Sequence, residues 1–152
     1  KIVLQSKRSL RRLEADAFVK GYRSTERRPD ELIVAVELPP PSPSTTVRAY
    51  KISRRRDLDI ASVSAGFALE RDPAGTVQRI ILTYGGMADR TRRAVSTEEF
   101  LQGKPWNRQT VGEAQEFVDR DFSPISDVRG SAEFRRIAAR NLLLKFWTET
   151  RS

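Results

Sequence analysis

The stretch "PPPSPSTT", residues 39–46, constrains the fold of this chain more than any other feature. Each of its four prolines fixes φ and removes an amide donor, so the stretch can lie neither inside a helix nor inside a strand. We therefore predict a linker at residues 41–46, with one unit before it at 1–40 and another after it at 47–152. A length of 152 residues allows one domain, or one domain and part of another.

Two residue types that carry much of protein chemistry, cysteine and histidine, are absent from the sequence. Their absence excludes disulfides, thiolate nucleophiles, Cys/His zinc sites, iron–sulfur ligation and Ser-His-Asp triads within this chain. The net charge of +8 favours anionic partners, such as nucleic acid, phosphate-bearing cofactors or acidic protein surfaces. No apolar run approaches the roughly 18 residues that a membrane span needs.

The first unit is predicted to hold a hairpin and a further strand. Residues 2–4 are apolar, "SKRS" at 6–9 is a turn, and residues 10–18 return. After a connection, "ELIVAVELP" at 31–39 is a β-branched, apolar run that Pro39 ends. Because the sequence starts in a strand-like segment and without methionine, we expect it to be part of a larger protein. Its apolar start is too short for a signal peptide.

The second unit is predicted to have three strands followed by three helices. The strands are "VRAYKISRR" at 47–55, a run from about Ser62 to Glu70, and "TVQRIILTYGG" at 76–86. Ser96, Thr110 and Ser131 each precede a helical pattern and are the expected N-caps, with Glu99 and Glu113 completing capping boxes. The chain is thus predicted to be α+β: an antiparallel three-stranded sheet followed by a cluster of three helices, preceded by the last strands of another domain.

The last helix is expected to pack into the core. Apolar residues recur along it at helical spacing, which predicts one buried face. These residues are Phe134, Ile137, Ala138, Leu142 and Phe146. The turn from Leu142 to Trp147 is apolar on almost every side, which indicates deep burial or an interface, and burial within the unit is the simpler interpretation.

Basic doublets are scattered over the expected hairpin, loops and helices. They lie at 7–8, 11–12, 27–28, 92–93 and 135–136, and a triplet occupies 54–56. Aromatic residues are few and do not alternate with base-reading side chains as a nucleic-acid platform requires. Acids stand beside many of the arginines, so solvated faces with ion pairs are the favoured interpretation.

Two further patterns offer weak chemical signals. Asp57 and Asp59 follow the arginine triplet, and neighbouring cations should lower their pKa values, which makes them poor general acids. Gly85 and Gly86 end a strand, where a glycine pair permits positive φ or the close approach of another group, although a tight turn is the commoner reason. No set of residues forms a recognisable catalytic group.

Three of these segments together resemble one protein family. "FVKGYRSTERRPDELIVAVELP" at 18–39, "YKISRRRDLDIASVSAG" at 50–66 and "LTYGGMADRTRRA" at 82–94 are similar, in this order, to the flavin-binding portion of xanthine dehydrogenases. The "YGGMADRT" segment is the most specific of them, and "FRRIAARNLLLKFW" at 134–147 is similar to the closing helix of that family. The resemblance covers nearly the whole chain.

The resemblance implies that this chain is the C-terminal part of a FAD-binding subunit. Residues 1–40 would end the FAD-binding domain, and residues 47–152 would form the flavoprotein C-terminal domain. The enzyme would pass electrons from xanthine or hypoxanthine through a molybdopterin centre and 2Fe-2S clusters, held elsewhere, to FAD and then to NAD. Its partners would be the rest of the flavin/iron–sulfur subunit and the molybdopterin-binding large subunit, in the cytoplasm, and the fragment alone would be inactive.

The same resemblance assigns cofactor-binding roles to five residues. Ile33 matches an apolar residue that packs against the isoalloxazine, Lys51 matches a lysine that contacts the flavin, and Tyr22 matches a tyrosine near the nicotinamide face. Arg56 and Asp59 match a loop that tunes the flavin potential and NAD entry. The loop differs from the family pattern of two adjacent acids, because Leu58 separates the acids here.

Two other interpretations stay open beside this one. A flavin subunit of another molybdenum hydroxylase, of the aldehyde or carbon monoxide type, is disfavoured by "YGGMADRT". A basic α+β module for acidic partners or nucleic acid would need Arg8, Arg12, Arg93 and Arg136 on one face. The flavin interpretation instead needs Tyr22, Ile33 and Lys51 in one cleft, with no nucleic-acid or membrane partner.

Overall fold

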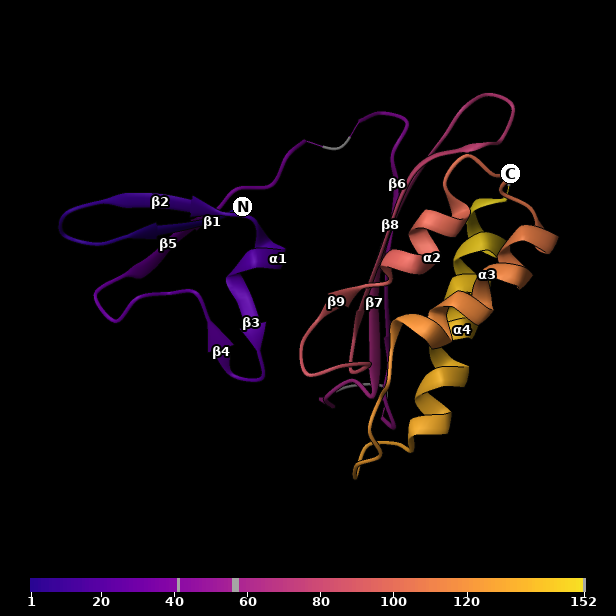
Figure 1. Cartoon of the computed structure of the whole chain (residues 1–152). Helices are drawn as coiled ribbons and strands as arrows, with labels where there is room; N and C mark the ends of the chain where they lie inside the picture. The colour runs from indigo at the N-terminus through magenta and orange to yellow at the C-terminus, as the bar shows by residue number, and fades with distance from the viewer. Residues whose placement is uncertain (41, 56–57, 152) are drawn as a thin grey trace. The chain divides into compact units, whose positions relative to one another are not determined.

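The chain forms two compact units, Lys1–Pro41 and Ser42–Ser152 (Figure 1). They are seen in a computed structural model, which describes residues 1–40, 42–55 and 58–151. No helix in these ranges has the length and apolar content that crossing a membrane would require. Each unit has its own sheet and is considered by itself below.

Unit 1 is built on a three-stranded antiparallel sheet in the order β2-β1-β5. The strands are β1 (Ile2–Gln5), β2 (Leu10–Leu13) and β5 (Leu32–Val36). The predicted hairpin is confirmed, but its returning strand ends at Leu13 instead of Phe18. The reason is local: the amides of Ala17 and Phe18 both bond to the Glu14 carbonyl, and this closes the short helix α1 (Ala15–Phe18).

The expected connection in unit 1 contains a second, smaller hairpin. Strand β3 (Val19–Gly21) pairs with β4 (Ser24–Thr25), and the segment then leads to β5. A buried carboxylate fixes this segment to β2. The Arg11 guanidinium donates to both oxygens of Glu31, at 2.5 and 2.8 Å, and the Arg28 amide donates to the same carboxylate at 2.7 Å. This bidentate pair holds together a unit with few buried apolar side chains.

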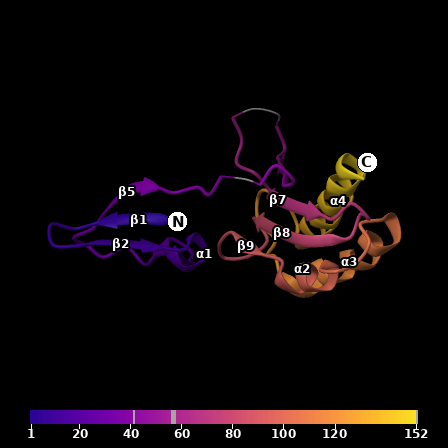
Figure 2. The ribbon, with the colours of Figure 1, turned by 90° about the horizontal axis from the view of Figure 1, so that it is seen from above.

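Unit 2 has a four-stranded antiparallel sheet in the order β6-β7-β8-β9 and three helices on one face of it (Figure 1). The strands are β6 (Thr46–Ile52), β7 (Val63–Arg71), β8 (Val77–Gly85) and the two-residue β9 (Arg92–Arg93). The helices are α2 (Val95–Leu101), α3 (Arg108–Asp121) and α4 (Ala132–Thr150). Figure 2 shows α2 and α3 side by side. The predicted α+β arrangement is confirmed, with β9 as an addition.

The two faces of this sheet differ in character. On β7 the side chains that face the helices are Val63, Ala65, Phe67 and Leu69, and all four are buried. Phe67 makes ring contacts with Tyr50, Tyr84 and Phe146 at centroid distances of 5.0–5.7 Å. On the opposite face β7 carries small residues, among them Ser64, Gly66 and Ala68. The core therefore lies between the sheet and the helices. The opposite face, which carries these small and at least partly exposed side chains, is called the open face.

The observed N-termini of the three helices can be compared with the predicted N-cap residues. Ser131 is confirmed as the N-cap of α4, because its side chain accepts from the Phe134 amide. The prediction for Thr110 was wrong: Asn107 caps α3 and accepts from the Thr110 amide. The prediction for Ser96 was also wrong, since α2 begins at Val95.

A side chain from another helix caps α2. The Asp121 carboxylate, at the end of α3, accepts from the amides of Ser96 and Thr97 at 2.9 Å and from the Thr97 hydroxyl at 2.6 Å. It satisfies amide donors that an N-cap side chain would otherwise serve. This tertiary contact replaces the capping box that the local sequence pattern predicts.

Candidate functional site

The five predicted cofactor-binding residues are distributed over both units. Tyr22 and Ile33 belong to unit 1, Lys51 and Asp59 belong to unit 2, and Arg56 lies outside the described residues. The structure therefore places Lys51 and Asp59 in one unit, where the lysine charge acts on the carboxylate, and Tyr22 and Ile33 in the other unit. Each pair is described in its own unit.

In unit 1 both residues are accessible. Gly21 pairs with Ser24, so Tyr22 and Arg23 form the two-residue turn between β3 and β4, and Tyr22 is 78% exposed at its tip. Ile33 lies on β5 opposite the fully buried Leu4, yet is itself 51% exposed. An aromatic ring and an aliphatic side chain are thus both exposed on this unit.

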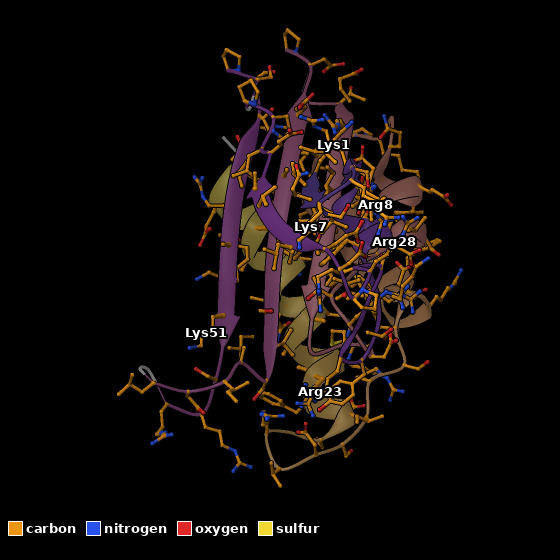
Figure 3. The ribbon with its side chains drawn as sticks, turned by 90° about the vertical axis from the view of Figure 1, so that its left-hand side faces the viewer. Lys1, Lys7, Arg8, Arg23, Arg28 and Lys51 are labelled. Carbon is orange, nitrogen blue, oxygen red and sulfur yellow. The ribbon has the colours of Figure 1, made fainter. Side chains whose placement is uncertain are left out.

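In unit 2 a row of three residues crosses the open face of the sheet. Lys51 on β6 pairs with Ser64 on β7, and Ser64 pairs with Gly85 on β8. Figure 3, in which the helices of unit 2 lie behind its sheet, shows Lys51 beside the end of β6. A β-carbon at Gly85 would lie 2.5 Å from the Ser64 hydroxyl oxygen, so a larger residue there would require the Ser64 side chain to move. The result is a flat, small-residue surface with one ammonium group at its edge.

The loop between β6 and β7 places a carboxylate near this ammonium. The Asp59 carboxylate accepts from the Arg55 amide at 3.0 Å. This hydrogen bond, together with the charges of Arg55 and Lys51, lowers the pKa of Asp59, as the sequence predicted. Asp59 is therefore a fixed negative charge rather than an acid catalyst. Leu58, which separates the two acids of the loop, is 95% exposed and has a φ of 51°.

One residue of this region was not identified from the sequence. Arg135, on the first turn of α4, is buried and donates through Nη1 to the carbonyls of Ser62 and Gly86. The signal was present: residues 135, 138, 139, 142 and 146 share one helical stripe, and the arginine occupies a position at which the pattern requires an apolar side chain. Its charge was noted as half of a basic doublet, but its position within this stripe was not.

Three of the five basic doublets contain arginines that pair with a carboxylate of the same unit. In unit 1, Arg11 pairs with Glu31 and Arg12 with Glu37. In unit 2 the pairs are Arg93–Glu98, Arg135–Asp127 and Arg136–Glu133. Three of the four arginines that a nucleic-acid surface would need thus have acidic partners. Within the described ranges no cluster of acidic side chains could hold a metal ion.

Comparison with known proteins identifies the class to which this fold and open sheet belong. The CO dehydrogenase flavoprotein C-terminal domain family matches residues 48–150, so the chain belongs to that family. Its similarity to xanthine dehydrogenase/oxidase of Gallus gallus is 34% identity over 149 residues, which is 96% of this chain. The resemblance to the flavin-binding portion of xanthine dehydrogenases is thereby confirmed.

Other relatives act on different compounds according to their names. A nicotinate hydroxylase of Emericella nidulans is 37% identical over 134 residues, which is 84% of this chain and 10% of that protein. The solved quinoline 2-oxidoreductase of Pseudomonas putida 86 has a TM-score of 0.85 at 26% identity, over 97% of this chain and 50% of that one. The chain spans about a tenth of the length of the curated relatives and half of this solved chain.

Proposed function

We propose that this chain forms part of the FAD site of a xanthine dehydrogenase. Residues 1–40 would be the end of the FAD-binding domain, residues 41–46 a linker, and residues 47–152 the flavoprotein C-terminal domain. When bound, FAD would supply the redox chemistry that takes electrons from 2Fe-2S clusters and delivers them to NAD. The observation that carries the proposal is the row of Lys51, Ser64 and Gly85 beside Asp59, in a chain of this family.

The row fits a flavin in both shape and charge. Ser64, Gly85 and the neighbouring Gly66 project little from the sheet, and a β-carbon at Gly66 would meet no atom within 4 Å. Among the described residues Lys51 has no hydrogen-bond or ion-pair partner, so its ammonium can bind an anionic group. A fixed cation stabilises a reduced, negatively charged cofactor, and the Asp59 carboxylate acts in the opposite direction. Together the two residues would set its potential.

The remaining predicted residues would complete the site from other segments. Ile33 would pack against the isoalloxazine, and Tyr22 would lie near the face at which the nicotinamide docks. Arg56 would bind NAD phosphates, for which a guanidinium is suited. Acid–base chemistry is not required of any of them, in keeping with the lowered pKa of Asp59.

The exposure of strand β5 supports the proposal that another protein segment covers unit 1 at this strand. All five of its residues are exposed, although its sequence is Leu-Ile-Val-Ala-Val, and within the described residues it pairs with a strand, β1, on one side only. A strand that is apolar on both faces is typical of a sheet interior. We propose that the rest of the flavin/iron–sulfur subunit covers it, and that a molybdopterin-binding large subunit is the further partner, in a cytoplasmic complex. The chain alone would be inactive.

A second candidate is the flavin subunit of another molybdenum hydroxylase. The 37% identity to a nicotinate hydroxylase favours it, because that identity is slightly higher than the identity to the xanthine dehydrogenases. In either case the chain would have the same role at the flavin, since substrate oxidation would occur on another segment or subunit.

A flavin-content measurement on three lysine variants tests the proposal. The chain is co-expressed with the preceding half of the flavin domain, purified by a tag on one of them, and its FAD is measured by absorbance. Removal of a charge-assisted contact costs about 1.5–3 kcal/mol, so Lys51→Ala should weaken FAD binding about tenfold or more, whereas Lys51→Arg should weaken it less. Lys145→Ala, which removes an exposed lysine of α4 paired with Glu149, is the matched control.

The result that contradicts the proposal is equal FAD content in Lys51→Ala and Lys145→Ala. For the loop, Arg56→Ala in the complete enzyme should change the KM for NAD while leaving FAD content unaltered. An unchanged KM would remove Arg56 from the acceptor site and leave the role of Lys51 standing.

A further inference from the structure

A buried arginine lies under the end of the sheet that carries the proposed flavin contacts. Arg135 is 4% exposed and occupies the apolar stripe of α4 that also contains Ala138, Leu142 and Phe146. Its Nε atom is buried without a hydrogen-bond partner in the described part of the chain. A charge in such a place carries a desolvation cost, and replacing a whole buried ion pair by apolar residues of similar volume is often neutral or stabilising. Stability alone therefore does not account for Arg135.

The guanidinium joins three loops. Nη1 donates to the carbonyl of Ser62, at the end of the β6–β7 loop, and to the carbonyl of Gly86, 2.8 Å away, directly after β8. Nη2 donates to the Asp127 carboxylate, 2.7 Å away, in the segment between α3 and α4. Ser62 strengthens the connection by donating its hydroxyl to the Arg129 carbonyl at 2.7 Å.

Two of these loops flank the row on the open face. The Ser62 amide bonds to the Ile52 carbonyl at 2.7 Å, so residues 52 and 62 close the base of the β6–β7 loop, one residue beyond Lys51. Gly86 follows Gly85, the last member of the row, and has a φ of 79°. A β-carbon at Gly86 would overlap the Ser62 carbonyl oxygen and lie 3.0 Å from Nη1 of Arg135. The two strand ends and the arginine are thus packed without spare volume.

We propose that Arg135 is a positioning residue that fixes the β6–β7 loop and the Gly85-Gly86 turn relative to each other. Through them it holds Lys51 and Asp59 in the arrangement that sets the electrostatics of the cofactor site, without touching the cofactor. This proposal deepens the proposed function and rests on it. Replacement of Arg135 should loosen the β6–β7 loop and change the redox equilibrium of the bound flavin, even where the fold is retained.

The first test needs no cofactor. The β6–β7 loop contains Arg54 and Arg55, so limited trypsin digestion of the full chain reports how firmly it is held, with cleavage sites identified by mass spectrometry. Arg135→Lys and Arg135→Met should be cleaved there about fivefold faster or more than the parent chain. Arg136→Met is the matched control, because the neighbouring Arg136 is more exposed and pairs at 3.9 Å with Glu133. Thermal unfolding measured alongside separates loop release from loss of the fold.

The second test uses the flavin-loaded complex. The equilibrium constant for electron exchange with a reference dye should change about threefold or more in Arg135→Lys and remain unchanged in Arg136→Met. Equal cleavage rates in the 135 and 136 variants would overturn the positioning role. An unaltered redox equilibrium together with faster cleavage would overturn the link to the cofactor. A parent complex that never binds flavin would refute the proposed function, while the cleavage rates would still decide whether Arg135 holds the loop.

Discussion

The Gly86→Ala substitution tests the packing at the end of β8 most directly. Gly86 has a φ of 79°, and a left-handed conformation costs a residue with a β-carbon about 1–2 kcal/mol. The added carbon would also overlap the Ser62 carbonyl oxygen, which Arg135 holds in place. Overpacking of this kind costs about 1–3 kcal/mol more, for a total of about 2–5 kcal/mol. That is a large part of the stability of a typical domain.

Gly75→Ala separates these two contributions. Gly75 has a similar φ of 83°, but a β-carbon there would meet no atom within 4 Å, so only the conformational cost of about 1–2 kcal/mol is expected. Urea unfolding followed by tryptophan fluorescence measures both, because Trp106 and Trp147 both lie in unit 2. Equal losses for Gly75→Ala and Gly86→Ala would refute the inferred contact between Gly86 and Ser62.

Two further predictions concern the core and the buried ion pair. Phe67→Ala should cost about 3–5 kcal/mol in the same urea assay, whereas Phe134→Ala, at a half-exposed site, should cost much less; similar losses would contradict the assigned core. The Arg11 guanidinium lowers the pKa of Glu31 from 4.5 to about 2, so this carboxylate stabilises unit 1 above about pH 4.5, and its contribution is lost as the pH falls toward 2. Hydrogen exchange of the β1 and β5 amides should show an acid-dependent loss of protection in the parent chain but not in Glu31→Gln. The control Glu37→Gln, which removes an exposed ion pair with Arg12, should still show that loss.

The strands and the order of elements could be predicted because their signals are local. The run from Ser62 to Glu70 was expected as a strand and is observed as Val63–Arg71, since alternate residues face the core. Ser131 was identified as a cap because its own side chain accepts the Phe134 amide. Asp121 could not be foreseen, because it caps α2 from a position 25 residues later in the chain than Ser96.

The burial of the last helix illustrates the same limit. Ala138, Leu142 and Phe146 are buried as predicted, whereas Phe134 and Ile137 are both 43% exposed. At about 100° per residue these five residues spread over about half of the helix circumference, and how much of that half the sheet covers depends on tertiary packing. Arg135 lies on the covered side, where its three acceptors come from loops that precede α4 in the sequence. No local pattern indicates those acceptors.

The free edge of β5 has a consequence for handling the isolated chain. A strand of five uncharged, apolar residues that has no partner on its second edge among the described residues can pair with the same strand of another copy, which is a route to aggregation. Natural proteins protect such edges with charged residues, prolines or a covering segment, and the strand itself contains neither charge nor proline. The yield of soluble chain should therefore depend on which neighbouring segment is synthesised with it, and a lysine at Val34 should reduce self-association when that segment is missing.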